Sequence, residues 1–163
     1  MNSLHRLLCW LFRYEDLSPN ADESYMLRWT LFDAFGRKAY LHKILATDWA
    51  REPHDHPKDF VSIGLSGQYV EEIYAVVDCG RMTPNYEQPK KLVLKDEVEY
   101  RAPWYRTFPA EHIHRLRVEP GEHCWTICIT GKQRRQWGFW MKDGTHLPYM
   151  EFMKLKYGWM ERR

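Results

Sequence analysis

The chain has 163 residues, of which 44% are hydrophobic and 28% are charged, and its formal net charge is +2. This length suits one domain with a core large enough to need no disulfide or metal for stability. The small net charge gives no strong attraction to nucleic acid or to a membrane surface. Aromatic residues reach 15% of the chain, which suits a β-rich fold or a ligand cavity.

The four cysteines, Cys9, Cys79, Cys124 and Cys128, form no Cys-x-x-Cys pair. Cys124 and Cys128 stand four apart in a predicted strand, roughly 13 Å along its axis, which is too far for a bridge. We expect reduced thiols, as is typical of cytosolic proteins. The apolar run at 7–12 is short and lacks a cleavage site, and no segment approaches the ~20 apolar residues that span a bilayer. The expected location is cytoplasmic.

The N-terminal part of the chain predicts a short helix. Leucines and a phenylalanine recur at helical spacing over residues 4–13, and a polar loop is expected over 15–24. The pattern then changes to extended runs separated by turn residues, with a tight hairpin turn at Ser66-Gly67. The extended runs cover 28–35, 37–45, 59–67, 68–77, 91–102, 124–131 and 134–141. Residues 105–119 lead into a turn at 120–123, and a short helix is expected over 148–159. This order predicts one all-β barrel or sandwich with helical ends.

Two His-x-His pairs stand at the entrances to extended runs: His54 with His56, and His112 with His114. On an extended backbone, residues two apart project to the same side, about 7 Å apart at their Cα atoms. Two imidazoles can then converge on one ion at roughly 2.0–2.1 Å per nitrogen. A solvated polar turn would explain one such pair. Two pairs, widely separated in a chain with only eight histidines, favour a metal site.

The first pair resembles the first motif of the cupin superfamily, whose members are small jelly-roll barrels. That motif runs His-x-His, three or four residues, Glu, six residues, Gly. Here His54-Asp-His56 is followed by a run that closes on Gly67, but Phe60 stands where the glutamate is expected. Asp59 lies one place too early and, in strict alternation, would face away.

The second pair resembles the second cupin motif, Pro-x-Gly-x-x-His. It reads Pro109-Ala-Glu-His-Ile-His114, with Glu111 in the glycine position and His114 in register. Glu111 could accept a hydrogen bond from a ligand imidazole or lie in an exposed loop. The chain also resembles small cupin-like proteins, frequent in phage and bacterial genomes, that carry "HDHP" near the middle and "WGF" near the end.

The resemblance covers residues 38–140 and implies an all-β, single-domain cupin jelly-roll barrel with short N- and C-terminal helices. Residues 1–163 form the domain, with helical or irregular ends at 1–37 and 141–163. The implied metal ligands are His54, His56 and His114, and a fourth ligand from His112, Asp59 or Glu71 stays open. Among divalent metals Fe(II) is favoured, with zinc, nickel, manganese or copper as alternatives.

Other polar residues are candidates for a catalytic role. Glu71 shares a strand face with Tyr69, and an inward carboxylate could bind the metal or act as a general base; alternatively, Glu71 and Glu72 both face solvent. Arg28 and Arg101 could hold a substrate carboxylate or phosphate, or lie on the surface. The basic and aromatic run at 134–140 suits nucleic acid, but its alternation better fits a barrel strand.

The resemblance therefore implies a metal-binding cupin, in first place a non-haem iron dioxygenase that acts on a small anionic molecule. One alternative is a metal-dependent sugar or nucleotide-sugar isomerase or epimerase, and another is a non-catalytic cupin that binds a small ligand. The expected partners are a small molecule and a second copy in a homodimer, without nucleic acid or membrane.

Overall fold

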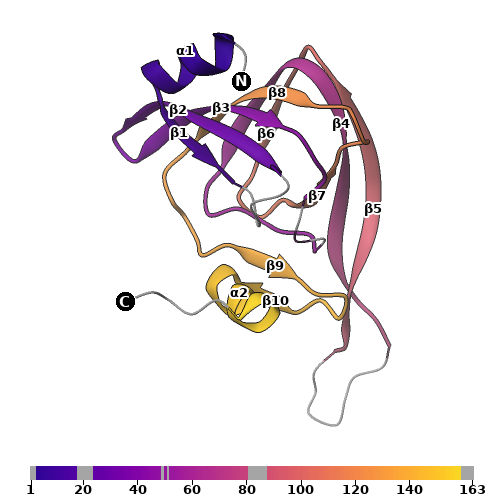
Figure 1. Cartoon of the computed structure of the whole chain (residues 1–163). Helices are drawn as coiled ribbons and strands as arrows, with labels where there is room; N and C mark the ends of the chain where they lie inside the picture. The colour runs from indigo at the N-terminus through magenta and orange to yellow at the C-terminus, as the bar shows by residue number, and fades with distance from the viewer. Residues whose placement is uncertain (1–2, 18–23, 49, 51, 81–87, 159–163) are drawn as a thin grey trace.

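The computed structural model describes residues 3–17, 24–48, 50, 52–80 and 88–158. Two short helices lie near the ends of this part of the chain, and strands fill most of what lies between them (Figure 1). This confirms the predicted all-β class with short terminal helices. In chain order the elements are α1 (Ser3–Leu11), β1 (Arg13–Asp16), β2 (Met26–Ala34), β3 (Arg37–Ile44), β4 (Phe60–Asp78), β5 (Lys90–Arg101), β6 (Trp104–Phe108), β7 (Ile113–Arg117), β8 (Cys124–Thr130), β9 (Gly138–Trp140), β10 (His146–Pro148) and α2 (Tyr149–Tyr157).

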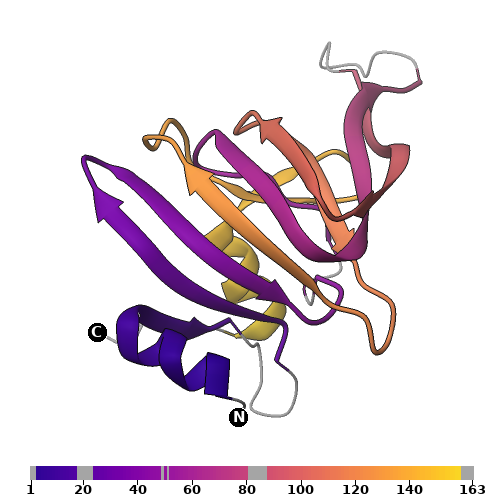
Figure 2. The same ribbon diagram turned by 90° about the horizontal axis from the view of Figure 1, so that it is seen from above.

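Eight of these strands form one curved antiparallel sheet. The strand order is β1-β2-β3-β8-β4-β5, and β6 and β7 also pair with β4. The first part of β4 pairs with β8 and β6, whereas its later part pairs with β5 and β7. Strand β4 therefore belongs to two parts of the sheet, and it joins the part that carries the β2–β3 hairpin to the part that carries the β4–β5 pair (Figure 2). Strands β9 and β10 pair with each other beside α2 (Figure 1).

The hairpin turn predicted at Ser66-Gly67 is wrong, because β4 runs without reversal for 19 residues. The register with β8 shifts between Gly64 and Ser66, which marks a β-bulge, and a bulge bends a strand rather than ending it. Gly67 has φ +81°, and a Cβ there would lie 1.8 Å from the carbonyl oxygen of His123. The Ser66-Gly67 pair therefore marks the point where β4 passes from one part of the sheet to the other.

The sheet also differs from the predictions near both ends of the expected core. Strand β2 pairs with β3 along its length and β1 pairs with β2, so the sheet begins before residue 38. The last extended run, expected over 134–141, is reduced to Gly138–Trp140. The reason is that the backbone N–H groups of Arg134 and Arg135 donate to the carbonyl of Pro57 at 2.8 and 3.3 Å, outside any strand ladder.

Two apolar clusters stabilise this arrangement. The first lies inside the barrel and consists of Ile44, Tyr69, Tyr100, Leu116, Val118 and Cys124. The second joins the C-terminal elements to the rest of the fold and consists of Ala50, Phe139, Phe152 and Met153. The four cysteines are all free. Among the described residues, no helix has the length and apolar character needed to cross a bilayer.

Candidate metal centre

The two histidine pairs lie side by side because their backbones are hydrogen-bonded. His54 donates its N–H to the carbonyl of His114 at 2.9 Å, and His114 returns the bond at 3.0 Å. His56 donates its N–H to the carbonyl of Ala110 at 2.9 Å. The segment before β4 is therefore fixed against the segment that leads into β7, and the structure brings together the three histidines that the sequence singled out.

The imidazoles of His54, His56 and His114 converge on one small volume. One ligand nitrogen from each ring lies within 4.8 Å of the other two. The Nε2 atoms of His56 and His114 are 2.8 Å apart. Two nitrogens bound to a single ion at 2.0–2.1 Å are separated by roughly 3 Å, so this spacing is close to what an ion requires.

Carboxylates lie behind two of these rings. The Nδ1 atom of His114 is in close contact with Glu71 Oε1, and the Nδ1 atom of His54 lies 3.6 Å from Asp48 Oδ2. An ionised carboxylate only accepts hydrogen bonds, so Nδ1 of His114 donates in this contact and Nε2 is the ring nitrogen left to face an ion. Metal-binding histidines characteristically hold a carboxylate on their other nitrogen in this way.

Asp48 is itself held in place. It is buried, and it accepts hydrogen bonds from the hydroxyl of Tyr25 and, at 2.8 Å, from the backbone N–H of Leu116. Nothing in the sequence around Asp48 indicated this role, because its partners lie far along the chain.

Glu71 also contacts the fourth histidine of the two pairs. His112 Nε2 lies 3.0 Å from Glu71 Oε1, so Glu71, His112 and His114 form a second group that could hold an ion. Burial raises the pKa of the Glu71 carboxyl, but hydrogen bonds from His112 and His114 outweigh it and bring the pKa to about 2. Glu71 is therefore ionised at neutral pH.

A buried carboxylate requires a compensating positive charge. Glu71 is 0% exposed, and its Oε2 atom has no hydrogen-bond partner within the described part of the chain. Burial also lowers the pKa of His54 to about 4 and that of His56 well below its usual value. Uncharged imidazoles are the form that binds metals, and a divalent cation would offset the charge of Glu71, so the residues present fit such a cation.

Aromatic side chains enclose the histidines. Phe60 stands where a cupin glutamate is expected; its ring packs edge-on against His56 at 4.5 Å and stacks on Phe108 at 4.8 Å. Trp137 and Phe139 lie 6.3 and 6.0 Å from the His54 ring. Glu71, further along β4, contacts Nδ1 of His114 and so lies behind that ring.

The two arginines predicted to hold a substrate anion are instead paired with glutamate side chains. Arg28 donates two hydrogen bonds to Glu15, at 2.9 and 2.7 Å. The Arg101 side chain is 71% exposed and pairs with Glu99 at 2.8 Å. No ion pair between described residues joins either guanidinium to the histidines. Tyr69 is buried in the barrel core, where burial and then the charge of Glu71 raise the pKa of its phenol.

The other acidic candidates, Asp59, Glu111 and Glu72, lie in three different environments. Asp59 pairs with Arg134 at 2.6 Å and accepts the N–H of Ala110 at 2.8 Å, facing away from the histidines as alternation predicts. Glu111 is an exposed loop residue, 3.6 Å from Arg134. The alternative that Glu71 and Glu72 both face solvent is wrong, since both are buried.

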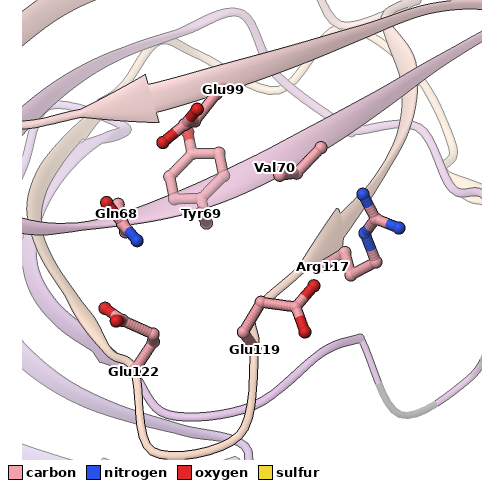
Figure 3. A pocket seen from close by; sticks show the side chains of 7 residues that line it. All are labelled: Gln68, Tyr69, Val70, Glu99, Arg117, Glu119 and Glu122. Atoms are coloured by element: carbon pink, nitrogen blue, oxygen red, sulfur yellow. The ribbon is translucent and has the colours of Figure 1, made fainter.

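A surface hollow of 210 Å³ has no histidine in its lining (Figure 3). It is lined by Gln68, Tyr69, Val70, Glu99, Arg117, Glu119 and Glu122. With three carboxylates and one guanidinium, this hollow does not suit an anionic ligand.

Comparisons with known proteins identify the fold. No protein-family model matches the chain, and no curated protein matches its sequence. A cupin-2 domain protein from Rhodospirillum rubrum superposes with a TM-score of 0.57 at 12% identity, covering 82% of this chain and 78% of that one. The polyketide cyclase RemF from Streptomyces resistomycificus gives 0.56 at 12% identity, with 96% and 93% covered. Fe(II) HppE in complex with its substrate gives 0.50 at 9% identity, with 74% and 56% covered. The chain has the cupin fold.

Proposed function

We propose that this protein binds a divalent metal through His54, His56 and His114, and that its activity is the oxidation of a small anionic molecule by dioxygen. The observation that carries the proposal is the convergence of three imidazoles, with Glu71 and Asp48 behind two of them. Fe(II) stands first among the metals, because it suits histidine sites with open positions and because one protein of similar fold is an Fe(II) protein.

The chain's own residues would prepare the site in three ways. Glu71 holds the His114 ring in the orientation that directs Nε2 inward. The aromatic rings of Phe60, Trp137 and Phe139 exclude water and lower the local dielectric constant, which strengthens electrostatic interactions. A bound Fe(II) would supply redox chemistry and open coordination positions. Because the three imidazoles are uncharged ligands, the ion would keep the part of its positive charge that Glu71 does not offset, and this charge would favour an anionic ligand.

The isomerase alternative requires a free general base inside the barrel. Glu71 is the inward carboxylate nearest the histidines, but two imidazoles already hydrogen-bond to it, and its pKa of about 2 makes it a weak base. Tyr69 is part of the apolar core. The dioxygenase proposal therefore has the better support from the arrangement of the residues.

The test is oxygen consumption with iron, with zinc and with no metal, on one panel of small carboxylates, phosphates and thiols. We expect turnover with iron alone, since zinc has no redox chemistry. We also expect the anaerobic Fe(II) protein to bind nitric oxide, and to bind it more tightly once an anionic substrate is present. Conversion of a sugar phosphate by the zinc protein, detected by product analysis and without oxygen uptake, would favour isomerisation. No turnover with any metal would favour a binding protein.

A further inference from the structure

Asp55 lies between the two histidines of the first pair and is 0% exposed. Its Oδ1 accepts the backbone N–H of Gly138 at 2.9 Å. Its Oδ2 accepts the indole N–H of Trp140 at 3.1 Å and lies 2.8 Å from Arg135 and 3.3 Å from His146. All four partners belong to the C-terminal part of the chain, and none of them belongs to the barrel strands.

The backbone reinforces this link. Asp55 donates its N–H to the carbonyl of Gly138 at 3.1 Å, and Trp140 donates its N–H to the carbonyl of Pro53 at 2.8 Å. His54 forms isolated bridges with both His114 and Phe139. The histidine-bearing segment therefore lies between β7 and β9, paired with one on each side.

Gly138 is required where the two segments meet. A Cβ at this position would lie 2.0 Å from the carbonyl oxygen of Leu147 and 2.9 Å from Nε2 of His146. Only glycine lets β9 approach β10 while its amide reaches Asp55. The "HDHP" and "WGF" runs, which are far apart in the sequence, thus form one structural unit.

We infer that Asp55 is a positioning residue of the proposed metal site: it attaches β9, β10 and α2 to the histidine-bearing segment and thereby fixes the direction of His54 and His56. The physical reason is the alternation of an extended backbone, on which Asp55 projects opposite to its two neighbours. Anchoring Asp55 prevents rotation of this segment, so both imidazoles stay aimed at His114. This inference rests on the proposed metal site, and it makes the C-terminal elements part of that site.

The test uses Asp55→Asn, which keeps the size of the side chain but presents an NH₂ group to donors. We expect the Kd for Zn(II), measured by competition with a chromophoric chelator, to rise about 10-fold, the lower end of the effect of removing a direct partner of a ligand, because Asp55 acts on His54 and His56 through the backbone. The absorption spectrum of the Co(II)-loaded variant should also change, because the ligands are displaced. A loss of stability alone would leave that spectrum unaltered.

Asp143→Asn is the matched control, since Asp143 is an exposed carboxylate of the same C-terminal part that hydrogen-bonds only the nearby Thr145. Its Kd should stay within threefold of the wild type. If Asp55→Asn does not fold, Trp140→Phe removes a single donor, and we expect a two- to fivefold rise in Kd with it. Unchanged affinity and an unchanged Co(II) spectrum in whichever variant folds would overturn the inference.

A second measurement separates this inference from the metal proposal. In the metal-free protein, amide hydrogen exchange at residues 54–56 and 138–140 should be faster in Asp55→Asn than in the wild type and in Asp143→Asn. If the wild type binds no metal, the proposed function fails, while this comparison still decides whether Asp55 fixes the segment. If the wild type binds metal and exchange is unchanged, the role of Asp55 alone is refuted.

Discussion

Glu71 and Glu72 provide a matched pair of substitutions, because they are adjacent on β4, are both buried and face opposite ways. Glu71 contacts His114 and His112, whereas Glu72 accepts two hydrogen bonds from Arg115, each 2.8 Å long. Each glutamate can be changed to glutamine, which keeps the size of the side chain and removes its charge. We expect Glu71→Gln to weaken metal binding and Glu72→Gln to leave it unchanged.

The magnitude follows from the hydrogen bonds that lose charge assistance. A bond to a charged group contributes about 1.5–3 kcal/mol and a neutral one about 1 kcal/mol. The bond from His114 to Glu71 therefore loses on the order of 0.5–2 kcal/mol of support for the metal-bound state, which is about 2- to 30-fold in Kd. Glu72→Gln removes the charge of a carboxylate that pairs with the partly buried Arg115, and we expect it to lower the free energy of unfolding by about 1–3 kcal/mol.

The assay is a Zn(II) competition titration for Kd, together with guanidinium unfolding in the presence of EDTA for stability. The reasoning predicts a change in Kd for the first variant and a loss of stability without a change in Kd for the second. Wild-type affinity in Glu71→Gln would refute the role given to this carboxylate. So would equal losses of affinity in both variants.

Three further predictions concern the pair of His112 and His114, the buried His42, and the bend in β4. His114→Ala should remove most bound metal and His112→Ala should remove less, as measured by metal analysis; the reverse order would favour the group of Glu71 with His112 and His114. Burial lowers the pKa of His42 to about 3. Between pH 6.5 and 3 the unfolded chain therefore binds a proton that the folded one does not, and the free energy of unfolding decreases as the pH is lowered. This contribution is about 1.4 kcal/mol per pH unit; unfolding profiles in EDTA with the same slope in wild type and His42→Leu would contradict it. Gly67→Ala should lower the free energy of unfolding by roughly 2 kcal/mol or more, because the added Cβ meets both backbone strain and a clash. Gly121→Ala, at φ +85° with no atom within 4 Å of an added Cβ, meets strain alone and should cost about 1 kcal/mol. Equal losses would show that the close approach at Gly67 is unimportant.

Much of the fold could be predicted, because strand alternation and turn residues are local signals. The extended runs over 28–35, 37–45 and 124–131 correspond to β2, β3 and β8. The hairpin expected at Ser66-Gly67 failed because a turn and a bend at a bulge use the same residue types. Only the pairing of β4 with β8, which involves residues far along the chain, distinguishes them.

The candidate site was also predictable only in part, because some of its features are local in the sequence and others depend on the folded chain. The spacing of His54 and His56 carries its own signal, since alternation places both side chains on one face. Which of Glu71 and Glu72 faces the histidines depends on the bulge earlier in β4, and a shift of one residue exchanges the two faces. The role of Asp48 depends on chain segments that meet only in the folded protein, and no spacing in the sequence indicates it.

Zinc-edge X-ray absorption of the zinc-loaded protein tests the proposed metal centre most directly. The account predicts one tightly bound zinc with three imidazole nitrogens at about 2.0–2.1 Å, and two imidazoles in His114→Ala. A spectrum dominated by oxygen ligands, fewer than three imidazoles in the wild type, or no stoichiometric zinc would contradict it.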